Sequence, residues 1–386
     1  MISSAVDTHQ KHAKLSRPSY GEWGRKELAI VGTTCEDCKA LAKAIIQQLP
    51  QYKVAYVDAD HKNAADATPK NSVIQDGAFI EFTDKISYTQ YNAATQLNAF
   101  QKRALFTDCD LILVNGNHFT ASAQIVVVDD RKPLEKKLDK LTDVKMILVR
   151  DSPADVPSFL MRHIPDIDAL PCLSFDDKDS ISKSIKQYLQ HQTPAINGLV
   201  LSGGQSTRMG KDKGSIFYHN KSQRDYVFDL LQTQCSDVFI SCNAQQARLH
   251  THTQKIEDTF LNLGPIGGIL SAFQQAPNAA WLTVACDLPF LNEHTIKHLI
   301  THRNPSKMAT AFWDVEDKFP EPLVTIWEPK AYPVLLHFLA QGYSCPRKAL
   351  INNDVEMLQA PDASAFTNVN TKEEYQEALV LLQKKD

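Results

Sequence analysis

The stretch LVLSGGQSTRMGKDKG, at positions 199–214, begins with three apolar residues. Two adjacent glycines follow, and then Arg208 and Lys213, which are five residues apart. Glycines directly after a strand let backbone N–H groups approach a phosphate or a base without interference from a Cβ atom. Arg208 offers a planar fork for phosphate oxygens, and Lys213 offers a point charge. This combination favours a polyphosphate site, although a plain glycine turn with two solvated cations has the same composition.

Other polar residues follow apolar stretches further along the chain. Asp287 stands in VACDLP, where a carboxylate just past a buried strand would suit Mg²⁺. Asn243 ends the stretch DVFISCN, and Asp258 precedes a glycine-rich loop with Gly264 and Gly268 that leads into a helix. Each residue alone could simply cap a turn or a helix. Their placement at successive strand ends favours one shared site.

The second half of the chain alternates strands with helices, which would bring these residues together. Expected strands lie at 197–204, 237–243, 280–289 and 321–328, and expected helices at 224–235, 266–276, 293–303, 331–342 and 371–384. Thr371 with Glu374 three residues later fits a capping box for the last helix. Such alternation predicts an open, mostly parallel sheet with ligands beyond the carboxyl ends of its strands.

The first half shows the same alternation. Its expected strands lie at 27–32, 53–60, 109–119, 124–130 and 144–151, with a helix at 38–49, and their apolar character is typical of buried parallel strands. The polar segment Leu189–Ile196, which contains a proline, is the best linker. We therefore expect a two-domain α/β protein with an N-terminal extension at 1–26, one domain at 27–192 and a second at 193–386.

Composition limits the classes of function. The chain has 386 residues, of which 43% are hydrophobic and 22% charged, so two ordinary domains with sizeable cores fit its length. A formal charge of -4 argues against a general surface for nucleic acid or anionic membranes. The N-terminal residues have no apolar core of a signal peptide, and no segment approaches a membrane span. We expect a cytoplasmic protein.

A family resemblance rests on several motifs in a fixed order. LSGGQSTRMGKDK, SCN, IED, GPIGGI, ACDLPFL, PLVTIWEP and FTNVNTKEEY follow one another over nearly all of residues 196–386, and this ordered set resembles the molybdenum cofactor guanylyltransferases, the MobA family. The resemblance implies a Rossmann-like nucleotidyltransferase. It would use GTP and Mg²⁺ to attach GMP to the terminal phosphate of molybdopterin, with release of pyrophosphate.

The resemblance also implies roles for single residues. The residues that would line the guanine and nucleotide pocket are Leu201, Ser202, Gly203, Gly204, Asn243, Asp258, Gly264 and Gly268. Arg208 and Lys213 would hold the triphosphate, and Asp287 would bind the magnesium. Asn368 and Asn370 match the asparagines that such enzymes direct toward the pterin, although N-x-N beside a helix cap is also a common turn.

Attack on the α-phosphate of GTP needs no covalent enzyme intermediate, so catalysis would come from positioning and charge neutralisation. The alternative enzymes are a cytidylyltransferase acting on the same pterin and a sugar-phosphate nucleotidyltransferase. A non-catalytic molybdopterin-binding scaffold is the alternative from another class, and the set of Arg208, Lys213 and Asp287 favours an enzyme over it. Molybdenum-insertion and molybdoenzyme-maturation proteins are candidate further partners; no nucleic acid and no membrane partner is expected.

The segment GTTCEDCKAL lies where a P-loop would lie, and the first domain resembles MobB, a GTP-binding P-loop protein. Counted from Gly32, however, Asp37 replaces the second glycine, Cys38 the lysine and Lys39 the hydroxyl residue. We expect a MobB-like, P-loop-NTPase-like sheet that has lost nucleotide binding. The spacing of Cys35 and Cys38 also allows a thioredoxin-like redox site, or two packing cysteines without function; alone they cannot complete a four-ligand zinc site.

Overall fold

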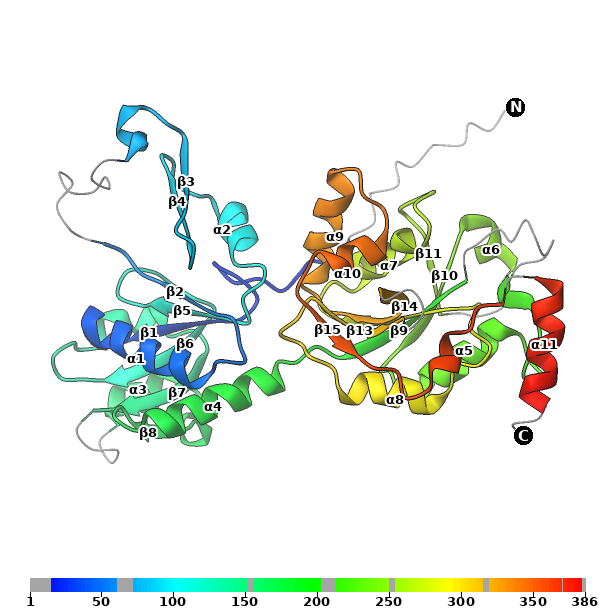
Figure 1. Ribbon diagram of the computed structural model, residues 1–386. Coiled ribbons are helices and arrows are strands. Elements are labelled where there is room, and N and C mark those ends of the chain that lie inside the picture. The colour runs from blue at the N-terminus through cyan, green and yellow to red at the C-terminus, as the bar shows by residue number, and fades with distance from the viewer. Residues whose placement is uncertain are drawn as a thin grey trace, which may run out of the picture. The chain divides into compact units, whose positions relative to one another are not determined.

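The computed structural model describes residues 15–60, 72–150, 156–202, 213–249, 254–314, 319–369 and 371–383. The chain divides into two compact units, Ser19–Gln192 and Thr193–Asp386, and the described residues 15–18 belong to the second. Each unit has its own sheet and its own hydrophobic cores (Figure 1). Both units are of the α/β type, as the alternation of strands and helices predicted. Among the described helices, none combines the length and the apolar character that crossing a membrane requires.

The N-terminal unit is built on a six-stranded sheet in the order β2-β5-β1-β6-β7-β8, with parallel pairing throughout. Its strands are β1 (Glu27–Val31), β2 (Val54–Val57), β5 (Leu111–Asn115), β6 (Ala123–Val128), β7 (Val144–Val149) and β8 (Cys172–Ser174). Its helices are α1 (Cys35–Gln48), α2 (Ala99–Leu105), α3 (Ser158–His163) and α4 (Lys178–His191). The predicted parallel sheet is confirmed.

Side chains of this sheet alternate between two cores. On β1, Leu28 and Ile30 join the core that α1 and α4 cover, whereas Ala29 and Val31 join the core on the opposite face. Trp23 belongs to that second core and is 5% exposed, although the sequence placed it in an N-terminal extension. The core of the unit thus begins ahead of its first strand.

A separate antiparallel hairpin in the N-terminal unit was not predicted. It consists of β3 (Ile80–Asp84) and β4 (Thr89–Ala93), which pair with each other and not with the six-stranded sheet. Figure 1 shows the hairpin standing off the edge of that sheet. Its strands alternate between exposed and half-buried residues, so they lack the continuous apolar run that marks the buried strands.

The C-terminal unit is a mixed, seven-stranded sheet in the order β11-β10-β9-β12-β14-β13-β15, in which β14 is antiparallel to both of its neighbours. Its strands are β9 (Ile196–Leu201), β10 (Val238–Cys242), β11 (Lys255–Glu257), β12 (Ala280–Ala285), β13 (Ala309–Trp313), β14 (Pro320–Trp327) and β15 (Val355–Leu358). Its helices are α5 (Gln223–Gln232), α6 (Ala244–Leu249), α7 (Pro265–Gln275), α8 (Glu293–Thr301), α9 (Ala331–Ala340), α10 (Pro346–Ile351) and α11 (Lys372–Gln383). The predicted open, mostly parallel sheet is confirmed.

Helices cover both faces of this sheet. On β12, Leu282 and Val284 pack with α5 and α8 on one face, and Trp281 packs with α7 and α9 on the other. The three parallel strands β9, β10 and β12 end at the same edge. The loops that leave that edge therefore lie close together, and they carry the predicted site residues.

The segment between the sheets differs from the predicted linker, since α4 continues to His191 and covers the first part of Leu189–Ile196. Pro194 follows, and its carbonyl accepts a hydrogen bond from Arg303 Nη1 at 2.8 Å. Arg303 also donates from Nε and Nη2 to the two carboxylate oxygens of Glu328, at 2.6 and 2.8 Å. This buried pair anchors the start of β9 to the end of β14.

Candidate active site

Strand β9 ends at Leu201, which is half-buried, and Ser202 follows at the carboxyl edge of the sheet. Ser202 is 4% exposed, and its Oγ donates to the backbone oxygen of Ser241 on the adjacent strand β10 at 2.9 Å. The hydroxyl thus holds the exit of β9 against β10. The predicted site residues that lie outside the described residues are Gly203, Gly204, Arg208 and Asn370. Lys213 starts the short 3-10 turn η5 (Lys213–Ser215), and its side chain is not among the parts that the structure describes.

Asp258 lies directly beyond β11 and is fixed from two sides. Its backbone N–H donates to the carbonyl of Cys242 at 2.9 Å, and its Oδ1 accepts a hydrogen bond from Ser241 Oγ at 2.7 Å. Burial raises the pKa of the Asp258 carboxyl above its usual value, while the bond from Ser241 opposes that shift. The carboxylate is therefore oriented and poorly solvated, and a ligand that donates hydrogen bonds would relieve its desolvation.

Gly268, in the first turns of α7, packs directly on this pair. A Cβ atom at Gly268 would lie 2.4 Å from Ser241 Oγ and 3.0 Å from Leu201 Cδ2, so only glycine fits without displacement. Gly264 precedes the helix at φ +64, a conformation that favours glycine, and Pro265 occupies the first turn. The two glycines thus serve the approach of α7 to the edge where β9 and β10 end.

Asn243 is placed as a helix cap. Its side-chain oxygen accepts from the backbone N–H groups of Gln245 and Gln246, at 3.0 and 2.9 Å, and Gln246 Oε1 accepts from the Asn243 N–H at 3.1 Å. This reciprocal arrangement fixes the start of α6. The side-chain oxygen of Asn243 therefore caps α6, and Gln246 Nε2 donates to the Ser202 carbonyl at 3.4 Å.

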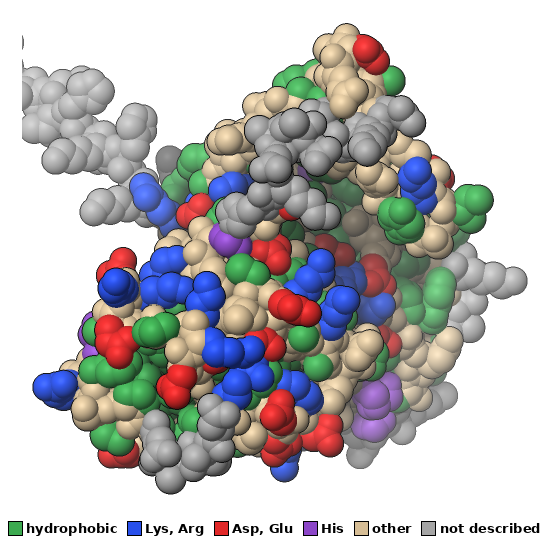
Figure 2. All heavy atoms as spheres, turned by 90° about the vertical axis from the view of Figure 1, so that its left-hand side faces the viewer, with side chains coloured by type: hydrophobic (Ala, Val, Ile, Leu, Met, Phe, Trp, Pro, Cys, Tyr) green, Lys and Arg blue, Asp and Glu red, His purple; other side chains and the backbone are tan. Residues whose placement is uncertain are grey.

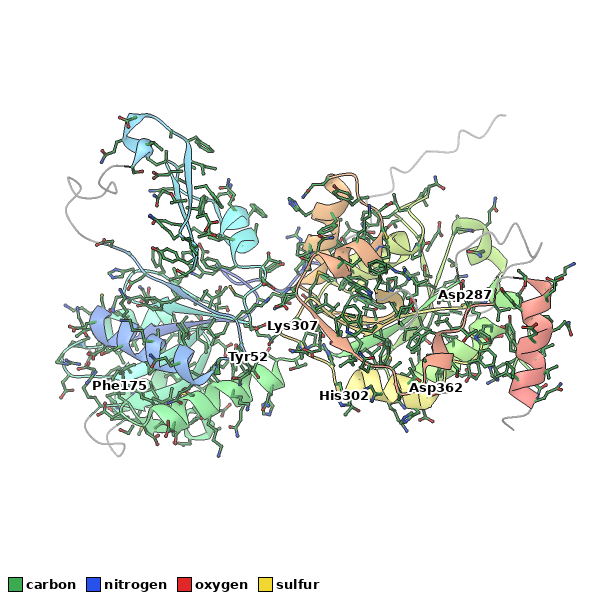
Figure 3. All side chains as sticks on the ribbon, viewed as in Figure 1. Tyr52, Phe175, Asp287, His302, Lys307 and Asp362 are labelled. Atoms are coloured by element: carbon green, nitrogen blue, oxygen red, sulfur yellow. The ribbon has the colours of Figure 1, made fainter. Side chains whose placement is uncertain are left out.

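Asp287 stands two residues beyond β12 and is half-buried (Figure 3). The backbone that follows it is clamped by three side chains from α5 and the segment before it. Gln223 Nε2 donates to the Leu288 carbonyl at 3.0 Å, and Tyr226 Oη donates to the Leu291 carbonyl at 2.9 Å. His219 Nε2 lies 2.8 Å from the Pro289 carbonyl, and its ring stacks on Tyr226. These contacts hold the turn that presents Asp287 at the sheet edge, and none of them was predicted from the sequence.

The segment with Asn368 lies beside this turn. The N–H of Val369 donates to the carbonyl of Asp287 at 3.3 Å, and Val369 packs with Phe290 in a small core that also includes α11. Asn368 is exposed. The predicted capping box is confirmed, because Thr371 N donates to Glu374 Oε2 at 3.0 Å and Glu374 N donates to Thr371 Oγ1 at 3.2 Å.

The surroundings of Asp287 are acidic. Burial raises the pKa of the Glu321 carboxyl on β14, and the carboxylates of Asp314 and Asp287 push that pKa in the same direction, whereas Arg347 opposes it. Among the described residues, no three His, Cys, Asp or Glu side chains converge on one point as a metal cage. Mg²⁺ does not need such a cage, since it keeps several waters and binds one or two carboxylates together with substrate phosphates. Asp287, in this concentration of negative charge, fits that kind of ion.

In the N-terminal unit, the loop at the P-loop position is filled by an ion network. Asp37 Oδ2 accepts from Arg131 Nη2 at 2.6 Å and lies 2.9 Å from Arg150 Nη2. Burial raises the pKa of Asp37, yet hydrogen bonds from Thr34 and Arg131 outweigh this effect and hold that pKa below its usual value. The Arg150 guanidinium stacks 4.2 Å above the ring of Phe175, which Figure 3 labels. A carboxylate and its paired cations thus occupy the region where a P-loop would receive phosphate.

Comparison with known proteins places the C-terminal unit in a sequence family. Residues 198–356 match the family model described as the MobA-like NTP transferase domain. The chain is 34% identical over 186 residues to a molybdenum cofactor biosynthesis bifunctional protein of Synechocystis, and that alignment covers 48% of this chain and 53% of the relative. The chain thus spans about half the length of that relative.

A molybdenum cofactor guanylyltransferase of Vibrio vulnificus is 31% identical over 192 residues, an alignment that covers 47% of this chain and 94% of the relative. Among solved structures, the molybdopterin-guanine dinucleotide biosynthesis protein A of Archaeoglobus fulgidus aligns at 20% identity with a TM-score of 0.42, over 49% of this chain and 99% of that one. A molybdopterin-guanine biosynthesis protein B aligns at 15% identity with a TM-score of 0.30, over 42% of this chain and 99% of that one. Both TM-scores lie under 0.5, so only the sequence relatives bear on function.

Proposed function

We propose that this chain, which belongs to the MobA-like NTP transferases, transfers GMP from GTP to the terminal phosphate of molybdopterin. The products would be molybdopterin guanine dinucleotide and pyrophosphate. The relatives that the chain covers almost from end to end are molybdenum cofactor guanylyltransferases, which supports this choice of substrates.

The observation that carries the proposal is the fixed carboxylate of Asp258 at the edge where β9, β10 and β12 end. Ser241 orients it at 2.7 Å, and burial leaves it short of solvent partners. Guanine presents an N1–H and an N2 amine side by side, and a carboxylate can accept from both. Cytosine has no such pair of donors, so its binding would leave the half-buried carboxylate with the bond from Ser241 but without donors from the base.

The chemistry of the transfer is proposed to fall to Arg208, Lys213 and Asp287. Arg208 and Lys213 are proposed to hold the triphosphate of GTP and to neutralise the charge that develops as pyrophosphate leaves. Asp287 is proposed to hold Mg²⁺, which would neutralise phosphate oxygens when bound. The clamp on the backbone after Asp287 keeps this carboxylate in place, so little reorganisation is needed during the reaction.

The acceptor is proposed to bind beside Asp287. The hydrogen bond from Val369 to the Asp287 carbonyl brings the segment with Asn368 to this turn. Asn370, which lies outside the described residues, is proposed to act with Asn368. Amide side chains can donate to and accept from the edge of a pterin. A terminal phosphate bound here would stand next to the proposed metal ligand, as in-line attack on the α-phosphate requires.

The test is incubation of the full chain with molybdopterin, Mg²⁺ and each of the four NTPs in turn, followed by pyrophosphate release. We expect release with GTP, dependent on molybdopterin, and a product with the mass of the guanine dinucleotide. Release with CTP alone would assign a cytidylyltransferase. Binding of molybdopterin without release with any NTP would assign a non-catalytic scaffold, and either result contradicts the proposal.

A further inference from the structure

Two cysteines of unequal exposure stand at the start of α1 in the N-terminal unit. Cys35 is the first residue of this 14-residue helix and is half-buried, and Thr34 caps the helix by accepting from the Asp37 N–H. Cys38 follows three residues later and is fully buried, with its Sγ 3.6 Å from the carbonyl of Ile30. A reagent from solvent can therefore approach Cys35, whereas Cys38 can react only with a group already bound at the site.

Hydrogen-bond donors converge on both sulfurs. His118 Nε2 lies 3.2 Å from Cys35 Sγ. Asn117 Nδ2 lies 3.7 Å from each of the two sulfurs and also donates to the carbonyl of Thr33 at 2.9 Å and to Asn115 Oδ1 at 3.1 Å. The orientation of the Asn117 amide is fixed by Lys137, whose ammonium donates to Asn117 Oδ1 at 2.7 Å. Because an ammonium can only donate, the atom it meets is the oxygen, and the amide nitrogen must face the sulfurs.

Cys35 stands at a helix N-terminus with an imidazole nitrogen 3.2 Å from its sulfur, surroundings in which exchange-active cysteines are found. Burial raises the pKa of the Cys38 thiol to about 12, and a charge on Cys35 adds to that shift. The two thiols thus differ in chemistry as well as in exposure. Cys35 is suited to attack an external disulfide, and Cys38 stays protonated until it attacks the mixed disulfide.

Other functions of the same residues fit less well. Asp58 approaches His118 at Nε2, 3.9 Å away, which is the nitrogen that faces Cys35. A Cys–His–Asp relay would need the carboxylate on the opposite ring nitrogen. The described residues contain no convergence of three metal-ligating side chains, so a zinc site is not indicated either.

Basic residues near the sulfurs indicate the charge of the reagent. Burial lowers the pKa of Lys137, and the neighbouring ammonium groups of Lys132 and Lys140 lower it further, so three lysines lie close together here. Figure 2 shows the N-terminal unit with basic and acidic side chains interspersed on the face that it presents. The carboxylate of Asp37 already pairs with Arg131 and Arg150, whereas the ammonium group of Lys137 donates to the amide oxygen of Asn117. An anionic reagent would find compensating charge beside Cys35.

We propose that Cys35 and Cys38 form a dithiol–disulfide exchange site whose substrate is a small disulfide that carries carboxylates. The Cys35 thiolate attacks one sulfur of the external disulfide, which forms a mixed disulfide and releases one thiolate. Cys38 then gives up its proton to the thiolate released in the first step, and its sulfur attacks Cys35 Sγ. A Cys35–Cys38 disulfide forms, the second thiolate leaves, and the external disulfide has been reduced to two thiols by the oxidation of the two cysteines.

Geometry permits this closure. Residues three apart on a helix have Cβ atoms about 5–6 Å apart, and a disulfide needs about 3.5–4.5 Å. The first turn of α1 must therefore tighten slightly when the disulfide forms. The inference is independent of the nucleotidyltransferase proposal, because it concerns the other unit and a different chemistry.

The test uses the full chain, reduced and freed of reductant, and then treated with oxidised glutathione. Remaining thiols are alkylated at timed intervals, and peptides are mapped by mass spectrometry. We expect a Cys35–Cys38 disulfide to form at least about tenfold faster than glutathione is added to Cys172, the exposed thiol of the same unit. Neutral hydroxyethyl disulfide should react more slowly than oxidised glutathione at Cys35.

Variants separate the two steps. Cys38→Ser should trap glutathione on Cys35, and Cys35→Ser should leave Cys38 unmodified, while Cys172→Ser serves as the matched control with unchanged closure. His118→Gln should slow the first step by about tenfold at neutral pH. Equal rates at Cys35 and Cys172 in the unmodified chain, or a disulfide between other cysteines, would overturn the proposal without any variant. A faster reaction with the neutral disulfide would overturn the assignment of the substrate class.

Discussion

Gly268→Ala is the substitution whose consequence follows most directly from the geometry of the nucleotide edge. The added Cβ would lie 2.4 Å from Ser241 Oγ, closer than such atoms approach one another. The hydroxyl is the end of a short side chain, so it would rotate away and give up its 2.7 Å bond to Asp258. A hydrogen bond to a charged group contributes about 1.5–3 kcal/mol. Alanine in place of glycine within a helix returns about 1 kcal/mol, so a net loss of about 0.5–2 kcal/mol is expected in the free energy of unfolding.

Ser241→Ala provides the matched control, because it removes the same hydrogen bond and also the atom that would clash. In that background the bond is already absent, so Gly268→Ala should be neutral or stabilising by up to about 1 kcal/mol. The coupling energy between the two positions should therefore be about 1.5–3 kcal/mol, within the range found for residues in contact. Urea unfolding followed by tryptophan fluorescence measures it, since Trp281 and Trp327 are buried in this unit. Additive costs in the double variant would refute the contact and the role of Gly268.

Three other outcomes are expected. Asp287→Asn should leave the fold intact and reduce turnover at least about tenfold, or about 1.4 kcal/mol; a steady-state rate above a tenth of the unsubstituted rate would make the metal assignment wrong. A fragment spanning 1–192 should bind neither GTP nor ATP in calorimetry, since Asp37 and Arg131 fill the P-loop position; micromolar binding would contradict this. Glu328→Ala should lower the free energy of unfolding by about 3–5 kcal/mol, because it leaves Arg303 buried without its carboxylate; a loss below about 1 kcal/mol in urea would contradict the anchoring role.

Much of the fold follows from apolar runs in the sequence. Strands such as β1, β5 and β12 are buried along their whole length, so each has a predominantly apolar sequence. Most strands that escaped prediction have other characters, although β13, which is buried over its first four residues, was missed as well. β15 is half-buried throughout, β11 has only three residues, and the β3–β4 hairpin lies outside the main sheet. Short or partly exposed strands of this kind give only a weak signal in local periodicity.

The site residues likewise divide into those that were predicted from the sequence and those that were missed. Asp287 was predicted from its place after a strand and Asp258 from its place before a glycine-rich loop, and the structure puts both at the edge where the parallel strands end. Ser241, which orients Asp258, was missed, although a serine within the apolar strand VFISC was the available signal. The clamp by Gln223 and Tyr226 on the turn after Asp287 was also missed, because it joins residues 65 positions apart. Gly268 was chosen for a glycine-rich loop, but its contact with Ser241 appears only when α7 is packed on the sheet.

Direct competition between two nucleotides is the measurement that tests the guanylyltransferase proposal most closely. The full chain is supplied with molybdopterin, Mg²⁺ and equal concentrations of GTP and CTP, and the two possible dinucleotides are quantified by mass spectrometry. Their ratio equals the ratio of kcat/KM values. The oriented carboxylate of Asp258 predicts at least about a hundredfold excess of the guanine product, on the order of 2.7 kcal/mol. Comparable amounts of the two products, or an excess of the cytosine product, would contradict the proposed reading of guanine by Asp258.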